Sequence, residues 1–416
     1  GEELELPELA EAAKVTALQG FDEVEMIEEA TLAQVQALVA DDRLTAKSEE
    51  AVFSAVARFA EAKQPAEADL LGLLRYVRFP LMSPSFLHQT VRRSPLLQAP
   101  AGQELLWEMM VPVASGLAQQ PRQGIGGRFL YVMGGRSEGG TTSVSSVEIY
   151  DTQTNSWAAG LPLPAASRSS EALGLGGKMF VTGGITAASG ASDAAHVFDP
   201  RAGDWTNVSP MMIGRYAHAV GVVGGKFYVF GGSDGRGGRP RHPEAFDPQT
   251  NTWTAVAPMP TTRAFMGTAV LDGKIYVVAG SPSVGKSTNV VEVYDPQTNT
   301  WATGPLMRTA RRSHGVATLG GKIYAAGGYG SNNEHFSSVE AFDPQTNSWA
   351  DVAPMSTARH SFSLTAARGK LYAVGGKDYS GGILATVEAY DPQQDRWEAV
   401  APLAIARYGA AASCMA

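Results

Sequence analysis

The sequence predicts a small all-α domain followed by an all-β propeller of repeated four-stranded blades. The first observation is a strict repeat of 48 residues, which is set by Trp157, Trp205, Trp253, Trp301, Trp349 and Trp397. A period of this length indicates a repeat architecture. The second observation is that the first hundred or so residues lack the repeat, are acidic and poor in glycine, and show helical periodicity. Function is therefore expected on a surface of equivalent loops.

Each repeat carries the same residue types at nearly the same offsets. A Tyr/Phe-Asp turn precedes the tryptophan, and a glutamate lies nine residues before it except in the second unit, which has His196. A diglycine precedes the glutamate position except in the fourth unit, which has Ala279-Gly280, and strand-like runs such as Lys226–Phe230 (KFYVF) lead into it. An arginine follows the tryptophan by ten residues in five units, whereas Arg168 follows by eleven. We therefore predict a one-residue insertion in the first unit and about four strands per repeat.

This order of diglycine, Glu, Tyr/Phe-Asp-Pro, Trp and Arg resembles the kelch repeat from about Arg122 to Ala416. The resemblance implies a six-bladed kelch β-propeller over residues 127–416. The chain enters this region at Gly127-Arg128 in the middle of a blade. The segment Arg407–Met415 is therefore expected to supply the strand missing from the first blade, which closes the ring and removes free sheet edges.

The N-terminal part shows the signals of several helices. Ser48 is a good N-cap, and an apolar stripe follows it at Val52, Ala55, Val56 and Phe59. Further stripes or start signals are those of Leu70, Leu71, Leu74 and Val77, of Ser83-Pro84, and of Leu105, Leu106 and Met109. We expect a helical domain over residues 1–115 and a linker over residues 116–126.

Two strings in this part, DDRLTAKSEEAVFSAVARF (41–59) and LLRYVRFPLMSPSFL (73–87), resemble the BACK domain. BACK followed by kelch resembles the BTB-BACK-kelch (kelch-like) family, with the BACK domain N-terminally incomplete here. The resemblance implies a protein-binding chain that presents a substrate to a cullin-3 ubiquitin ligase. No segment of the chain resembles a BTB domain, so cullin-3 is expected as a partner only if a BTB domain lies upstream. The alternative is a structural or cytoskeletal scaffold without ligase coupling.

Composition limits the classes of partner. Residues 1–118 carry a net charge of −10 and the remainder +2, so there is no strongly basic face for nucleic acid. No apolar run has the length of a membrane span, and we expect no membrane partner. Cys414 is the only cysteine in the chain, which excludes an intrachain disulfide. A cytoplasmic or nuclear location fits this composition best.

We find no catalytic constellation with useful spacing, and we expect no enzyme activity, cofactor or metal. Some kelch propellers are enzymes, galactose oxidase being one, but these need copper ligands and a crosslinked cysteine–tyrosine pair. The repeated arginines and glutamates are better interpreted as structural hydrogen-bonding groups, because a buried charge needs a partner. His218 and His314 both lie three residues after a repeat arginine and are expected to pack between strands.

Binding is expected where the repeats differ from one another. In kelch propellers of this family, partner peptides bind a face lined by the positions after the diglycine and after the arginine. The first set is Arg136, Ile185, Ser233, Ser281, Tyr329 and Lys377. The second set is Ser169, Tyr216, Ala264, Arg312, His360 and Tyr408. Both sets vary while their neighbours repeat, as expected of a surface.

Arginine and aromatic residues dominate energetic hot spots of interfaces. On this basis the predicted partner-binding residues are Arg136, Tyr216, Arg236, Phe265, Arg312, Tyr329, His360, Lys377, Tyr379 and Tyr408. The face is slightly basic, so the predicted ligand is a short acidic or mixed-charge protein segment.

Overall fold

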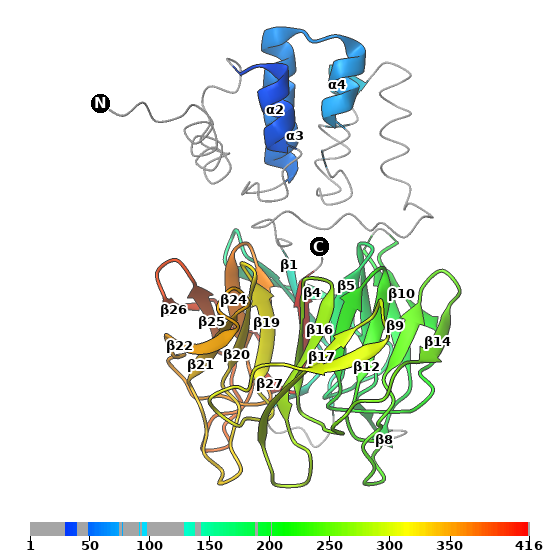
Figure 1. Cartoon of the computed structure of the whole chain (residues 1–416), viewed down its shortest axis with the longest axis vertical. Helices are drawn as coiled ribbons and strands as arrows, with labels where there is room; N and C mark the ends of the chain where they lie inside the picture. The colour runs from blue at the N-terminus through cyan, green and yellow to red at the C-terminus, as the bar shows by residue number, and fades with distance from the viewer. Residues whose placement is uncertain are drawn as a thin grey trace. The chain divides into compact units, whose positions relative to one another are not determined.

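The computed structural model describes residues 30–39, 49–74, 77, 91, 94–97, 129–137, 143–187, 190–200 and 202–414. The chain divides into two compact units, Gly1–Gly127 together with Ala416, and Arg128–Met415 (Figure 1). Several predicted features lie outside the described residues. These are the Ser48 cap, the helices at Ser83-Pro84 and Leu105–Met109, and the linker at 116–126.

The described part of the first unit is helical. Its elements are α2 (Leu32–Val39), α3 (Glu49–Lys63), α4 (Glu67–Leu74) and the 3₁₀ turn η5 (Pro95–Leu97). Thr31 and Gln34 cap α2 reciprocally: the Thr31 N–H donates to the Gln34 side chain at 2.8 Å, and the Gln34 N–H donates to the Thr31 hydroxyl at 3.3 Å. The predicted stripe of α3 is buried at Val52, Ala55, Val56 and Phe59. None of the described helices is long and apolar enough to span a membrane.

The second unit is a propeller of six four-stranded antiparallel sheets. From the innermost strand outward, blade 1 consists of β28 (Ala411–Cys414), β1 (Phe129–Met133), β3 (Val147–Asp151) and β4 (Ser156–Gly160). Blade 2 consists of β5 (Glu171–Leu175), β6 (Lys178–Thr182), β9 (Ala195–Asp199) and β10 (Asp204–Val208). Blade 3 consists of β11 (Ala219–Val223), β12 (Lys226–Phe230), β13 (Glu244–Asp247) and β14 (Thr252–Ala255). Blade 4 consists of β15 (Gly267–Leu271), β16 (Lys274–Gly280), β17 (Thr288–Asp295) and β18 (Thr300–Thr303). Blade 5 consists of β19 (Gly315–Leu319), β20 (Lys322–Ala326), β21 (Val339–Asp343) and β22 (Ser348–Val352). Blade 6 consists of β23 (Ser363–Ala367), β24 (Lys370–Val374), β25 (Val387–Asp391) and β26 (Arg396–Val400). The six-bladed propeller predicted from the repeat is confirmed.

The C-terminal strand closes the ring, as predicted. β28 pairs antiparallel with β1, with Leu130 opposite Cys414 and Met133 opposite Ala411. A short second ladder joins β2 (Arg136–Ser137) to β27 (Arg407–Tyr408). Because β28 is innermost, it also neighbours β5 of blade 2 and β23 of blade 6. The two ends of the described propeller thus build one blade together.

The repeated diglycine allows two loops to approach each other closely. Gly231 and Gly232 both have positive φ, of 52° and 92°. A Cβ at Gly231 would lie 2.4 Å from the carbonyl oxygen of Arg263, and one at Gly232 would lie 2.8 Å from that of Tyr216. Both the conformation and the space therefore require glycine at these positions, and the loop after β12 passes directly over the backbone of its neighbours.

The repeated tryptophans tie each blade to the preceding one. Trp301 packs edge-on against Phe230 of blade 3, at 5.8 Å between ring centroids, and against Tyr294 of its own blade at 5.1 Å. Its indole N–H donates to the carbonyl of Ala257, 44 residues earlier, at 2.9 Å. The same bond recurs at all six tryptophans, with Trp157 bonded to Ala401 across the closure. The period in the sequence thus reflects a period of contacts between blades.

Buried ion pairs form a second tie between blades. In each pair, an arginine from the loop before a blade meets a glutamate on the third strand of that blade. The pairs are Arg263–Glu292, Arg311–Glu340, Arg359–Glu388 and Arg407–Glu148, at 2.5 to 2.8 Å, and Arg215–Glu244. The arginine side chains are at most 1% exposed. The structural interpretation of these repeated charges is therefore confirmed.

Blade 2 lacks this pair because both partners are replaced. The carbonyl of Ser167 accepts the Gly135 N–H at 2.8 Å, as the carbonyl of Arg215 does for Gly184 at 2.9 Å. Ser167 therefore occupies the arginine position, and the insertion predicted between Trp157 and Arg168 is wrong. The glutamate position holds His196, whose ring bonds Asn207 at 2.8 Å. Losing both charges together avoids a buried charge without a partner.

Candidate functional site

Two kinds of loop share one end of the propeller. One kind joins the second strand of a blade to the third, and the other joins the fourth strand to the first strand of the next blade. In an antiparallel meander these loops leave from the same end. We call this end the loop face; β8 (Gly190–Ala191) and β27 lie on it, at the lower end of the propeller in Figure 1. Both predicted sets of binding positions belong to this face.

The structure brings the two predicted sets together in pairs. The N–H of Arg312 donates to the carbonyl of Tyr329 at 3.1 Å, and the reverse bond has the same length. The pairs Tyr216 with Ser233, Ala264 with Ser281, Arg312 with Tyr329, His360 with Lys377, and Arg136 with Tyr408 all lie opposite each other. Five of the six blades thus present one residue from each predicted set side by side.

In blade 2 the predicted set contains one wrong residue. Arg168, not Ser169, lies opposite Ile185, with reciprocal backbone bonds of 3.2 and 2.7 Å. This correction follows from the arginine position being filled by Ser167. Arg168 is therefore a surface residue of the loop face, and its guanidinium lies 3.4 Å from the hydroxyl of Ser143.

Residues of blades 5, 6 and 1 form one cluster on the loop face, in which some neighbours meet through their side chains and others through backbone pairing. We call it the cationic–aromatic cluster; its members are Arg136, Arg312, Tyr329, His335, His360, Lys377 and Tyr408. The guanidinium of Arg312 lies 4.3 Å from the centre of the Tyr329 ring. His360 lies 4.8 Å from Tyr329 and 5.2 Å from His335, between ring centroids.

At the other end of the cluster, the Lys377 ammonium lies 4.2 Å from the centre of the Tyr408 ring. Tyr408 is in turn paired with Arg136 through the β2–β27 ladder. Cations held over aromatic rings in this way keep their charge while losing part of their freedom, so less entropy remains to be lost on binding.

His360 is neutral at the centre of these cations. Burial, together with the nearby His335, Lys377 and Arg312 and against the opposing effect of Asp378, lowers the pKa of His360 to about 4. The cationic side chains of the cluster are those of Arg136, Arg312 and Lys377. A site with these groups favours a carboxylate or phosphate over a neutral or cationic group.

The remaining predicted residues lie outside the cluster. Tyr216 lies in blade 3 beside Ser233. Arg236 is exposed in the next loop, where its N–H donates to Asp234 at 2.8 Å. Tyr379 is 80% exposed at the tip of the blade 6 loop. Phe265 lies at the mouth of the central channel. The structure therefore brings six of the ten predicted residues into one cluster and leaves these four apart.

A closed ring of backbone hydrogen bonds surrounds the mouth of the central channel. Each member donates its N–H to the carbonyl of the equivalent residue in the preceding blade, at 2.7 to 3.0 Å. The members are Ser169, Ala217, Phe265, Ser313, Ser361 and Gly409, all with positive φ. Because the N–H of every ring member is used within the ring, these six residues have no backbone donor left for a ligand at this opening.

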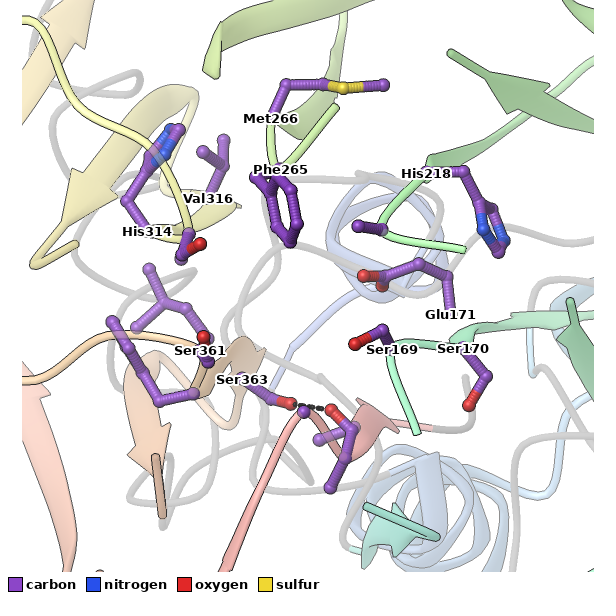
Figure 2. A pocket seen from close by; sticks show the side chains of 18 residues that line it. Ser169, Ser170, Glu171, His218, Phe265, Met266, His314, Val316, Ser361 and Ser363 are labelled. Atoms are coloured by element: carbon purple, nitrogen blue, oxygen red, sulfur yellow. Dashed lines mark hydrogen bonds between the residues drawn. The ribbon is translucent and has the colours of Figure 1, made fainter. Parts of the chain in front are cut away.

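Behind this ring lies a cavity of about 120 Å³ in the channel. Glu171 and Phe265 point towards its open middle, while His218 and Met266 point away from it (Figure 2). His218 and His314 are buried, as predicted, and His218 contacts the Thr182 hydroxyl at 3.0 Å. Burial next to a repeat arginine lowers the pKa of each histidine to about 3, so both are neutral at physiological pH.

Sequence reasoning missed two residues of this face, His335 and Glu171. His335 comes from the loop of blade 5 and lies opposite Tyr329; nothing in the repeat marks it. Glu171 carried a clear signal, because the equivalent positions in the other five units hold only small residues. Among the described residues, no group of three His, Cys, Asp or Glu side chains could hold a metal ion.

Comparison with known families supports the prediction of kelch repeats. The KLHDC2/KLHL20/DRC7 Kelch-repeats domain matches residues 169–376, which is half of the chain. The chain belongs to the kelch-repeat family. A Kelch motif model matches residues 130–160 and 358–404, and the model described as "BTB And C-terminal Kelch" (BACK) matches residues 1–92.

A solved structure titled "Structure of YjhT" is similar to this kelch chain in fold. The two share 16% sequence identity with a TM-score of 0.55, over 64% of this chain and 96% of the other. At this identity the likeness concerns the fold alone. BACK and kelch domains together make this kelch chain a protein–protein interaction module.

Proposed function

We propose that this chain is the substrate-recognition part of a cullin-3-type ubiquitin ligase adaptor. The propeller holds a short acidic or mixed-charge segment of its partner on the loop face, and the BACK domain connects the propeller to the ligase. The chain itself catalyses no reaction. The observation that carries the proposal is the cationic–aromatic cluster, where variable positions of three blades converge.

The chemistry of the cluster favours an acidic segment. Arg312 and Lys377 each lie over an aromatic ring, at 4.3 and 4.2 Å from its centre. A carboxylate that approaches either cation gains a charge-assisted hydrogen bond, and the neighbouring ring covers apolar parts of the peptide. Neutral His360 can accept or donate one further bond without adding charge.

The ligand class can be tested with a displayed library of random peptides and the full chain. We expect enrichment of peptides with Asp or Glu. An Arg312→Ala/Lys377→Ala variant should bind the enriched peptides at least about tenfold more weakly, since each charge-assisted bond contributes roughly 1.5–3 kcal/mol. Lys226→Ala/Lys274→Ala is the matched control, because these lysines pair with Asp247 and Asp295 at the opposite end of the blades. Equal losses in both variants would remove the cluster as the binding site.

The proposed ligase role is tested with the native, full-length protein. Affinity capture with wild-type and cluster-variant baits, followed by mass spectrometry, should recover a cullin with both baits and a substrate only with the wild type. A partner recovered in stoichiometric amount without any cullin would instead favour the scaffold function.

We also propose a cytoplasmic or nuclear location. The support is that the chain contains a single cysteine, Cys414, so it cannot form the intrachain disulfide framework that is common in secreted domains. Fluorescence microscopy of the tagged native protein tests this, and a secretory or organellar pattern would contradict it.

A further inference from the structure

Glu171 is an acidic side chain inside the channel mouth. It is the first residue of β5, two residues after the ring member Ser169, and its backbone is paired with Thr182 of β6. Its carboxylate points into the cavity of about 120 Å³ (Figure 2). A water molecule occupies roughly 30 Å³ in the liquid, so this space can hold a small charged group with several waters.

This carboxylate is an exception within the repeat. The equivalent residues are Ala219, Gly267, Gly315, Ser363 and Ala411. The channel wall therefore needs only a small residue for packing, and the fold alone does not explain a glutamate. In two of these blades there is no room for one: a Cβ at Gly267 would lie 2.3 Å from Val316, and one at Gly315 would lie 2.4 Å from Leu364.

Glu171 has no partner among the described residues, since none donates a hydrogen bond to its carboxyl or forms an ion pair with it. The elements packed against β5 carry few ionisable groups. His218, just before β11, is neutral; Cys414 of β28 has its pKa raised by burial to about 12; and Lys178, at the far end of β6, pairs with Asp199 at 3.0 Å. Burial raises the pKa of Glu171 itself to about 8.

We propose that the channel mouth binds one cationic side chain, a lysine or an arginine, of the partner segment, with Glu171 as its counter-ion and the Phe265 ring beside it. This inference rests on the proposed function and narrows it. The ligand is a mixed-charge segment whose acidic residues contact the cationic–aromatic cluster and whose basic residue enters the channel. A lysine suits the depth of the site because its ammonium lies at the end of a flexible four-carbon stem.

Binding is coupled to the protonation of Glu171. The free carboxyl is mostly protonated at neutral pH, and the cation binds the ionised form, so one proton passes to the solvent when the cation enters. Affinity for a cationic side chain should therefore rise from about pH 6 to about pH 8. Ligands bound by the cluster alone gain nothing from this ionisation.

The first test uses the same displayed peptide library with wild type and with Glu171→Gln, which keeps the shape and removes the charge. The wild type should enrich peptides with Lys or Arg at a fixed distance from the acidic residues, and Glu171→Gln should lose that preference while keeping the acidic one. The enriched peptides should bind the variant at least about tenfold more weakly. Glu171→Ala is a second variant that should fold, because blade 3 has alanine at this position.

A second measurement does not depend on any peptide. The side-chain carboxyls of glutamate are labelled with ¹³C, and the Glu171 signal is assigned by its loss in Glu171→Gln. Titration with Nα-acetyl-lysine methylamide should lower the apparent pKa of Glu171 by about one pH unit or more. Nα-acetyl-norleucine methylamide, which has a similar stem without the charge, should leave that pKa unchanged.

The outcomes separate this inference from the proposed function. Acidic peptides enriched equally by wild type and Glu171→Gln, with no basic residue, would overturn the channel site and leave the cluster. If the library gives no acidic preference at all, the proposed function fails, and the titration decides the channel site by itself. A Glu171 pKa that does not respond to the lysine probe overturns the inference in either case.

Discussion

Single residues that break the repeat show what each position tolerates. His314 replaces the Met266 of blade 4 and the Phe362 of blade 6 at one buried position. Neither nitrogen of its ring has a hydrogen-bond partner in the described part of the chain. Burial, and the neighbouring Arg311, lower the pKa of His314 to about 3. In an unfolded chain the same histidine titrates near pH 6.5.

This difference makes the stability depend on pH. Between about pH 6.5 and pH 3 the unfolded state binds a proton at His314 that the folded state does not, so stability falls as the pH decreases through this range. The slope from this residue is about 1.4 kcal/mol per pH unit. His314→Met should remove that slope, and urea unfolding at several pH values between about 4 and 6.5 measures it. If the free energy of unfolding had the same pH dependence in wild type and variant, the histidine would already be charged in the folded state.

At the scale of elements, the arginine of the loop before a blade and the glutamate on the third strand of that blade are either both present or both replaced. Arg311 donates to Glu340 at 2.8 Å and also to the carbonyl of Gly327 at 2.9 Å, with both charged side chains fully buried. Blade 2 has Ser167 and His196 at these two places. Replacing one member of a buried pair leaves the other charge buried without a partner, whereas replacing both members leaves no unpaired charge. Blade 2 therefore shows that the fold does not require the pair.

A double-mutant cycle in blade 5 tests this coupling. Arg311→Ser and Glu340→His alone should each destabilise the propeller by roughly 3–5 kcal/mol, because each leaves a buried charge without its partner. The double variant reproduces blade 2 and should cost clearly less than the sum of the two single variants. Urea unfolding of the four proteins measures the coupling energy. Additive losses would mean that the two groups contribute independently.

The same elements show how far sequence alone reaches. The Trp301 spacing, the diglycine before Glu340 and the Arg407–Met415 segment predict blades, strand order and closure, because each has a repeated local cause. The pairing of the two binding sets also follows from the repeat. The cluster at His335 and His360 does not, since it depends on loop side chains that no repeat constrains. The insertion predicted before Arg168 is wrong, because a serine at the arginine position followed directly by an arginine looks the same in the sequence as a shift by one residue.

At the scale of the whole molecule, the ring depends on a few residues at its end. β28 supplies the innermost strand of blade 1, and Ala411 and Ser413 are 1% and 2% exposed within it. It also stands between the innermost strands of blades 6 and 2. Without it, β1 becomes an open edge, and two neighbouring blades lose their packing on one side. Closure is thus a property of the entire propeller, although four residues provide it.

Deletion of residues 411–416 should therefore abolish cooperative unfolding of the propeller. The loss should exceed the roughly 5–15 kcal/mol by which such domains are stable, because one strand and two interfaces between blades disappear together. Deletion of residues 415–416 alone is the control and should change little, since β28 ends at Cys414. A synthetic peptide of residues 403–416, added in excess to the truncated chain, should restore a thermal transition whose midpoint rises with peptide concentration, because it binds only the folded ring. A truncated chain that unfolds like the wild type would show that blade 1 is stable with three strands and that closure contributes little.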